Sequence, residues 1–353
     1  MDDAAEGQRE QGHGGRCEET AQVFGSVLKA FALHLARNGL TLDDVSRKAG
    51  VTLPPAGALY SRFLSLNDYA HLLEFGARML KDDYIGVRCS GLPDGGAMHP
   101  LMLAIAYAPT PKVAFEVIAA HHRSLIDLAD CTARTSGKRT ELVWRLSPRI
   151  VLRDQLADRI AAALAVRLST ALGPDVMRLA EFRIARSKPA DLKLHRQVFG
   201  ASLAFDAPYN SVSLPVDQAE RALPRHDPAL FSALVELAQR RTADRGQVTG
   251  VAGLVGEEIA QNLSKADLSL EMVARTLGVS ARVLQRRLSE QGQSFQELYD
   301  QVRRETAADL LRNTSLPISE IAFRLGFSAV GNFTRAAKRW FGTTPSQWRH
   351  SGD

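Results

Sequence analysis

The sequence has little cysteine, and no segment of it resembles a membrane span or an export signal. Its three cysteines, Cys17, Cys89 and Cys131, are odd in number and widely spaced, and they form no CxxC or zinc pattern. We interpret them as reduced thiols of a cytoplasmic protein. A run of about 18 apolar residues is absent, so no transmembrane helix is predicted. Residues 1–15 lack the basic and apolar regions of a signal peptide.

The short motifs of common enzyme classes are also missing. GxSxG, HExxH, GxGxxG and GxxxxGK[ST] do not occur. The glycine-rich segment 91–99 has no lysine, so we interpret it as a loop and not as a phosphate cradle. His121 and His122 would point about 100° apart on a helix, which disfavours a shared metal ion. The sequence therefore predicts no enzyme, no cofactor and no metal site.

What is present is the composition of an ordinary globular protein with clustered positive charge. The chain has 353 residues, of which 45% are hydrophobic and 24% charged, enough for two domains with separate cores. The net charge of +5 permits nucleic acid binding without demonstrating it. The clustering of the basic residues is more informative. Two predicted helices carry Arg282, Arg286 and Arg287, and Arg335, Lys338 and Arg339.

Residues 20–228 show the patterns of both helices and strands. Two extended runs, 126–135 and 139–146, flank the polar turn S-G-K and predict an antiparallel hairpin. We expect a further strand at 85–88. Helical patterns cover 18–38, 41–49, 69–80, 99–107, 111–122 and 151–172. The fold class predicted for this region is α+β, with helices on a small, mainly antiparallel sheet.

The remaining residues divide into a tail, a connector and a helical domain. Residues 1–19 are polar, and we expect a disordered tail. Residues 229–250 are predicted to form a connecting helix followed by a linker, because 242–249 are polar and lack apolar periodicity. Residues 251–350 have helical patterns only, so an all-α domain is expected there.

One helix-turn-helix pattern occurs twice within residues 251–350. In the second copy, an apolar helix over 318–325 ends at Gly326, and Ser328 is the expected N-cap of the next helix. The first copy reads V-A-R-T-L-G-V-S (273–280), which matches I-A-F-R-L-G-F-S (321–328). The recurrence of apolar residues, alanine, leucine, glycine and serine predicts two units of this kind.

A single long helix is predicted between the two copies, over 294–312. Its apolar residues form one face, and Arg303, Arg304 and Arg312 are expected on its outer surfaces. At about 1.5 Å per residue this helix is about 28 Å long. It could hold two recognition helices near one turn of B-DNA apart, so that one chain reads two successive major grooves.

The C-terminal stretch resembles the DNA-binding domain of the AraC/XylS family of transcription regulators. The family signature is carried by P-I-S-E-I-A-F-R-L-G-F-S…F-T-R-A-A-K-R-W-F-G-T-T-P-S-Q-W-R, and the linker helix by G-Q-S-F-Q-E-L. Two residues depart from the expected pattern. Ala337 stands where the family commonly has Phe, which would thin the packing. Gly331 lies inside a helix, where glycine costs about 1 kcal/mol against alanine.

The resemblance implies a set of DNA-contacting residues. The base-contacting residues would be Arg282, Gln285, Arg286, Val330, Gly331, Thr334 and Arg335. Arginine pairs with guanine and glutamine with adenine in the major groove. The phosphate-contacting residues would be Ser280, Arg287, Ser328, Lys338 and Arg339. The alternative for the charged residues is an ordinary solvated helix face.

The N-terminal region resembles the arabinose-binding-type domain of family members such as the ornithine-responsive and VirS-type regulators. The supporting stretches are A-P-T-P-K-V-A-F-E-V (108–117) and V-F-G-A-S-L-A-F-D-A-P-Y-N-S-V-S-L-P (198–215). This resemblance implies effector sensing and dimerisation in residues 20–228, without making arabinose the ligand. Tyr107, His122 and Trp144 could line an effector pocket, or they could equally belong to the core.

Together these patterns predict a sequence-specific, effector-responsive transcription regulator of the AraC type, commonly an activator. The partners implied by the resemblance are double-stranded promoter DNA, RNA polymerase, an unknown small-molecule effector and a second copy of the chain in a homodimer. No membrane partner is expected. Two alternatives stay open: a non-specific nucleoid-type DNA-binding protein, and an enzyme with an appended nucleic-acid-binding module.

Overall fold

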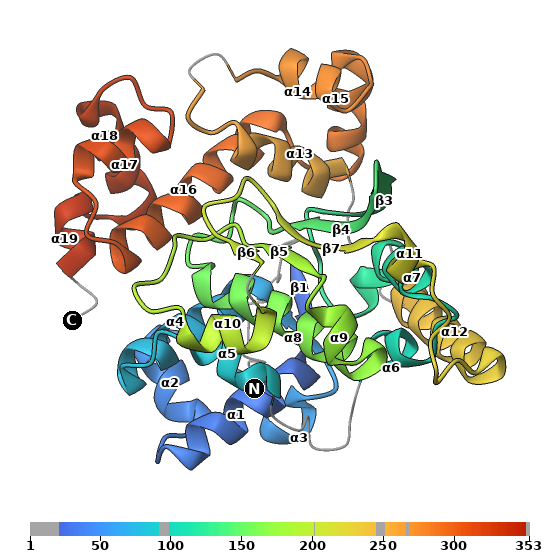
Figure 1. Cartoon of the computed structure of the whole chain (residues 1–353). Coiled ribbons are helices and arrows are strands. Elements are labelled where there is room, and N and C mark those ends of the chain that lie inside the picture. Colours follow the sequence, from blue (N-terminus) through green and yellow to red (C-terminus); the bar gives the residue numbers. More distant parts are fainter. Residues whose placement is uncertain (1–20, 92–98, 201, 245–250, 266–267, 351–353) are drawn as a thin grey trace, which may run out of the picture.

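The protein has two hydrophobic cores, one in each half of the chain. The computed structural model describes residues 21–91, 99–200, 202–244, 251–265 and 268–350. The first core draws its buried residues from Val23 to Leu223, and the second from Ala252 to Ala337. In Figure 1 the second core belongs to the orange and red helices, which lie on one side of the sheet-containing half. This is the predicted combination of an α+β and an all-α part.

The first half contains a small sheet among many helices. Its strands are β1 (Gln22–Phe24), β2 (Phe63–Ser65), β3 (Asp130–Ser136), β4 (Arg139–Arg145), β5 (Glu181–Arg183), β6 (Leu203–Ala204) and β7 (Asn210–Pro215). Its α-helices are α1 (Leu28–Arg37), α2 (Leu42–Ala49), α3 (Ala56–Leu59), α4 (Leu66–Leu80), α5 (Ile85–Arg88), α6 (Pro100–Tyr107), α7 (Pro111–His121), α8 (Asp154–Leu172), α9 (Pro174–Met177), α10 (Lys193–Phe199), α11 (Val216–Ala219) and α12 (Pro228–Asp244). Three short 3₁₀ turns are η1 (Gly25–Val27), η2 (Cys89–Gly91) and η3 (His122–Ser124).

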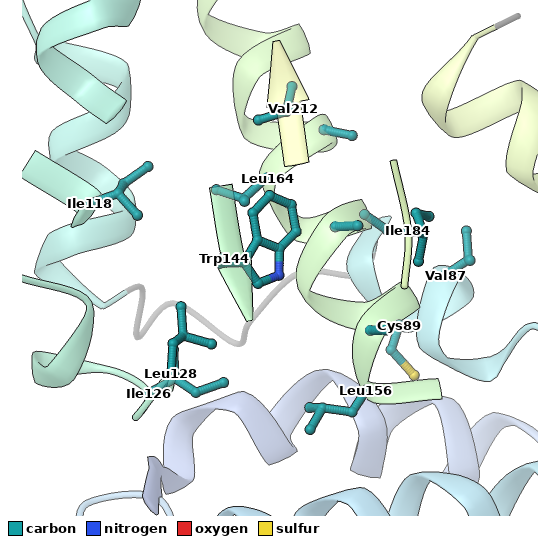
Figure 2. Packing of buried hydrophobic residues seen from close by; sticks show 14 of the residues in the cluster. Val87, Cys89, Ile118, Ile126, Leu128, Trp144, Leu156, Leu164, Ile184 and Val212 are labelled. Atoms are coloured by element: carbon teal, nitrogen blue, oxygen red, sulfur yellow. The ribbon is translucent and has the colours of Figure 1, made fainter. Parts of the chain in front are cut away.

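The main sheet has the strand order β3-β4-β7-β5-β6. All its pairings are antiparallel except that of β5 with β6. Leu142 pairs with Val212 and Trp144 with Asn210, so the inward residues of β4 and β7 share one face. Figure 2 shows Trp144 at the centre of this core, between Leu164 of α8 and the pair Ile126 and Leu128. The predicted hairpin at the turn S-G-K is the β3–β4 pair.

Three expectations for the first half need correction. Residues 85–88 form helix α5 and not a strand, because a short apolar run has no period that separates the two. A Cβ at Gly86 would clash with the carbonyl of Gln155, so the glycine lets α5 pack closely on α8. Residues 22–24 form strand β1, which pairs with β2, where a helix was expected. Residues 242–244 continue α12; the predicted tail and the rest of the linker lie outside the described residues.

The described residues of the second half form helices joined by loops, without a strand. Its helices are α13 (Val251–Gln261), α14 (Leu270–Thr276), α15 (Ala281–Glu290), α16 (Phe295–Asn313), α17 (Ile318–Arg324), α18 (Val330–Phe341) and α19 (Pro345–His350). Figure 1 shows α16 running from the α14–α15 pair to the α17–α18 pair. Ser294 and Glu297 form a capping box at the start of α16, which fixes where this helix begins. None of the described helices is long and apolar enough to cross a bilayer.

The two halves meet where α4 faces α16. The Asn67 side-chain amide donates to Asp309 Oδ2 at 3.2 Å, and His71 Nε2 lies 3.7 Å from Asp309 Oδ1. Burial raises the pKa of Asp309 to about 6 and lowers the pKa of His71. Because His71 is then uncharged near neutral pH, its contact with Asp309 is not an ion pair. Arg149 adds a charged contact with Glu305 of α16.

This interface predicts that Asp309→Asn stabilises the protein at high pH. The folded pKa of Asp309 exceeds that of an unfolded aspartate, so the folded state binds more protons between about pH 4 and 6. Stability therefore falls as pH rises through this window, and above it the buried charge carries its full cost. We expect the variant to gain about 1–3 kcal/mol at pH 8 and much less at pH 4, measured by urea unfolding.

The matched control is Asp175→Asn, because Asp175 is 90% exposed and pairs only with Arg178 one turn away. We expect this control to change stability little at either pH. A lower stability of Asp309→Asn at pH 8 would instead mean that the interface needs the negative charge.

Candidate nucleic-acid interface

The first helix-turn-helix unit consists of α14 and α15. Gly278 takes a φ of +68° between the two helices, a conformation that favours glycine. The Ser280 hydroxyl accepts a hydrogen bond from the backbone N–H of Val283 at 3.3 Å and so caps α15. Leu284 and Leu288 are buried against the core. Four residues on the opposite face are exposed: Arg282, Gln285, Arg286 and Arg287.

Within the described part of the chain, the exposed arginines of α15 have one weak ion pair with another side chain. Arg286 lies 3.6 Å from Glu290 one turn along the helix, and both side chains are more than 60% exposed. A surface pair of this kind contributes little to stability. A phosphate or a base edge can therefore take the place of Glu290 without a large loss.

The second helix-turn-helix unit consists of α17 and α18, and its turn is more constrained. Gly326 has a φ of +71°, and a Cβ there would clash with the carbonyl oxygen of Leu263. Helix α18 begins at Val330 and its N-cap is Ala329, so the prediction that Ser328 caps this helix is wrong. The Ser328 hydroxyl instead accepts a hydrogen bond from the Asn332 side chain at 3.4 Å. The turn is one residue longer than that before α15, which moves Ser328 out of the cap position.

The outward face of α18 is basic but offers few groups for reading bases. Its exposed residues are Val330, Gly331, Arg335, Lys338 and Arg339. Thr334 is half-buried and its hydroxyl donates to the carbonyl of Val330 at 3.0 Å. Arg335 donates a hydrogen bond to the side chain of Asn332. Asn332 was not among the residues predicted from the sequence to contact DNA. Phe333 and Ala337 are fully buried on the inner face.

Helix α16 holds the second unit through Arg303, which was expected on an outer surface. Its guanidinium lies 4.0 Å from the ring centre of Tyr299 and 4.4 Å from that of Phe327. Arg303 also donates to the carbonyl of Gly326 at 2.9 Å. The expectation for Arg303 was wrong because its position on the helix was read from the apolar pattern alone. Arginine packs its planar group on aromatic rings as readily as it faces water.

Asp300 forms a second tie between α16 and α18. It accepts hydrogen bonds from Arg339 at 2.7 Å and from Trp340 Nε1 at 2.9 Å. The Arg339 side chain is 65% exposed even with this contact. All five predicted phosphate-contacting residues are exposed: Ser280, Arg287, Ser328, Lys338 and Arg339.

A separate candidate site is a largely apolar cavity of about 110 Å³ in the first half. Trp144 and His122, two of the three residues predicted for an effector pocket, line this cavity. Tyr107 is not among its described lining residues. Its backbone carbonyl accepts a hydrogen bond from the ring of His226 at 3.0 Å, near the start of α12.

Comparison with known families agrees with this geometry. The model described as the arabinose-binding domain of AraC transcription regulators matches residues 39–223, which is more than half of the chain. A helix-turn-helix domain model matches residues 273–351. The chain therefore belongs to the AraC family of transcription regulators, which bind DNA and are not enzymes.

Individual relatives share less of the chain. The ornithine utilization regulator of Pseudomonas aeruginosa is 34% identical over 46% of this chain and 48% of its own length. The match thus spans about half the length of that relative. The transcriptional regulator VirS of Mycobacterium tuberculosis is 24% identical over 82% of this chain and 85% of its own. The crystal structure of the regulator CdpR of P. aeruginosa covers 87% of this chain and 96% of that one, at 23% identity and a TM-score of 0.40.

The two glycines of the second unit are predicted to respond oppositely to alanine. Gly331 lies in the first turn of α18 with nothing within 4 Å of an added Cβ. Gly331→Ala should therefore stabilise the protein by about 0.5 kcal/mol through helix propensity. Gly326→Ala should destabilise it by about 1–3 kcal/mol, because the positive φ and the Leu263 carbonyl both oppose a side chain. Urea unfolding of the full chain measures both, and a loss of stability for Gly331→Ala would contradict the open site.

Proposed function

We propose that the protein is an effector-responsive, sequence-specific regulator that places α15 and α18 in successive major grooves on one face of promoter DNA. The observation that supports this most is the spacing element. Helix α16 has 19 residues, or about 28 Å at 1.5 Å per residue. It separates two basic helices by a length close to one turn of B-DNA, about 34 Å.

The two recognition helices would divide the contacts between bases and phosphates. Arg282, Gln285 and Arg286 are exposed together on α15, where bidentate pairing with guanine and adenine is possible. Val330, Gly331, Thr334 and Arg335 would face the bases from α18, with less hydrogen-bonding capacity. The phosphate contacts would come from Ser280, Arg287, Ser328, Lys338 and Arg339, of which Arg339 also donates to Asp300.

The first half would bind the effector and so regulate DNA binding. The cavity beside His122 and Trp144 is a candidate effector site, and α4 connects that half to α16 through Asn67 and Asp309. An effector would change promoter occupancy and recruitment of RNA polymerase, with activation as the expected direction. We place the protein in the cytoplasm as a homodimer that reads paired half-sites.

Sequence specificity can be tested directly with the purified chain. A gel-shift titration at fixed salt would compare DNA from upstream of its own gene with scrambled DNA of the same length and composition. The proposal predicts a clear preference for the upstream DNA. Equal affinity for both would point to a nucleoid-type protein that binds the phosphate backbone without reading sequence.

Replacement of Arg286 and of Lys338 should have different effects on DNA binding. Arg286→Ala should cost about 1–3 kcal/mol and relax specificity at one base position, because it removes a base contact. Lys338→Ala should weaken binding uniformly across sequences and lower the salt slope by about one. The measurement is a titration of each variant on DNA carrying single base substitutions, at several salt concentrations.

Each variant is the control for the other, since both remove one exposed positive charge from a recognition helix. Uniform weakening by Arg286→Ala, with the same salt effect as Lys338→Ala, would make Arg286 a phosphate contact.

A further inference from the structure

The described lining of the cavity in the first half consists mainly of hydrocarbon side chains. They come from several elements of the fold, including α6, α7, α8 and β4, and include Met102, Ile118, Ile126, Leu128, Leu142 and Leu164. Figure 2 shows Ile118, Ile126 and Leu128 on one side of Trp144 and Leu164 beside it. A cavity with such walls favours an apolar ligand, because a hydroxyl placed against hydrocarbon loses its hydrogen bonds to water.

One buried donor in the wall of this cavity lacks an acceptor. Trp144 is 1% exposed, and its Nε1 has no hydrogen-bond partner among the described residues. An indole N–H can only donate, and a buried donor without an acceptor destabilises the folded protein. A ligand that brings an acceptor oxygen would remove this cost.

His99 adds a second donor. Its Nδ1 accepts a hydrogen bond from the backbone N–H of Leu101 at 3.3 Å, so the ring proton is assigned to Nε2. Burial lowers the pKa of His99 to about 4, and the nearby carbonyl of Ser124 counters this only in part. The ring is therefore neutral at physiological pH. Its Nε2 makes no hydrogen bond of normal geometry within the described part of the chain.

The charged residues of the wall are both arginines of α8. Arg159 is more than nine-tenths buried and donates from NH1 to the Ser90 hydroxyl at 3.3 Å. Arg167 lies two turns further along the helix and also lines the cavity. Arginine offers donors only. No aspartate or glutamate occurs among the described lining residues, so the charged groups of the described wall are positive.

We propose that this cavity binds a short-chain, apolar carboxylate, with its hydrocarbon part among the aliphatic residues and its oxygens accepting from Trp144, His99 and the arginines. The inference rests on the proposed effector response and names the class of effector. A cavity of 150 Å³ in another protein binds benzene, so 110 Å³ suits about four to six non-hydrogen atoms. A pentose is too large for this space.

The test is a binding titration of the full chain, followed calorimetrically and by thermal shift, in the absence of DNA. The probes are propanoate and butanoate, with butylamine as a cation of similar size and L-arabinose as the sugar. We expect saturable binding and a raised melting temperature for the two carboxylates only. Absence of carboxylate binding, or preferred binding of butylamine or L-arabinose, overturns the inference.

A variant locates the bound carboxylate. Trp144→Phe keeps an aromatic ring and removes the N–H, and should weaken butanoate binding about tenfold or more, the effect of one hydrogen bond to a charged group. Trp340→Phe is the matched control, because Trp340 lies on α18 and bonds to Asp300; it should leave binding unchanged. If Trp144→Phe and the wild type bind the carboxylate equally well, the proposed position of the carboxylate beside Trp144 is wrong. If Trp144→Phe does not fold, the preference of the wild type for carboxylate over amine still tests the proposed ligand class.

A DNA titration with and without butanoate separates this inference from the proposed function. Carboxylate binding that leaves DNA affinity unchanged would refute the effector response and retain the ligand class. A change in DNA affinity caused by L-arabinose and by no carboxylate would retain the effector response and refute the ligand class.

Discussion

The packing of Arg303 between two aromatic rings is the contact on which the geometry of the second DNA-binding unit depends. Its guanidinium stacks between Tyr299 of α16 and Phe327 of the turn, and it also holds the carbonyl of Gly326. The turn cannot relax easily, because Gly326 has a positive φ and faces the Leu263 carbonyl without room for a Cβ. The direction of α18 relative to α16 is therefore set at this one point and reinforced by Asp300.

The two helix-turn-helix units differ in how firmly α16 holds them and in which side chains they expose. The second unit is tied to α16 by Arg303 and by the Asp300 contacts, yet its outward face presents Gly331 and Val330, which offer no side-chain hydrogen bonds. The first unit presents Arg282, Gln285 and Arg286 on α15, with only a weak surface pair at Glu290. If both helices enter DNA as proposed, the first would carry more of the base discrimination. The second would act more by fixing the protein on the phosphate backbone.

The sequence predicted most where a local pattern repeats, and least where a contact joins distant residues. The two helix-turn-helix copies, the long helix between them and the β3–β4 hairpin follow from spacing and turn residues alone. Helix α5 was missed because its four residues have no period and are placed by Gly86 against α8. Arg303 was missed because its aromatic partners come partly from Phe327, beyond the helix that carries it. The exposed positions of α15 could be predicted, but the cavity could not, since its wall combines residues from most of the first half.

Helix α4 is the element that borders both the cavity and the DNA-binding half. Tyr69 lines the cavity, whereas Asn67 and His71, two positions before and after it, face Asp309 on α16. A ligand that favours one position of α4 would thereby favour one set of contacts with the helix that spaces α15 and α18. Such a ligand can shift DNA binding only by the difference in its affinity for the two arrangements. The contact between neutral His71 and Asp309 suits this role, because it is not an ion pair and a buried ion pair would cost more to separate.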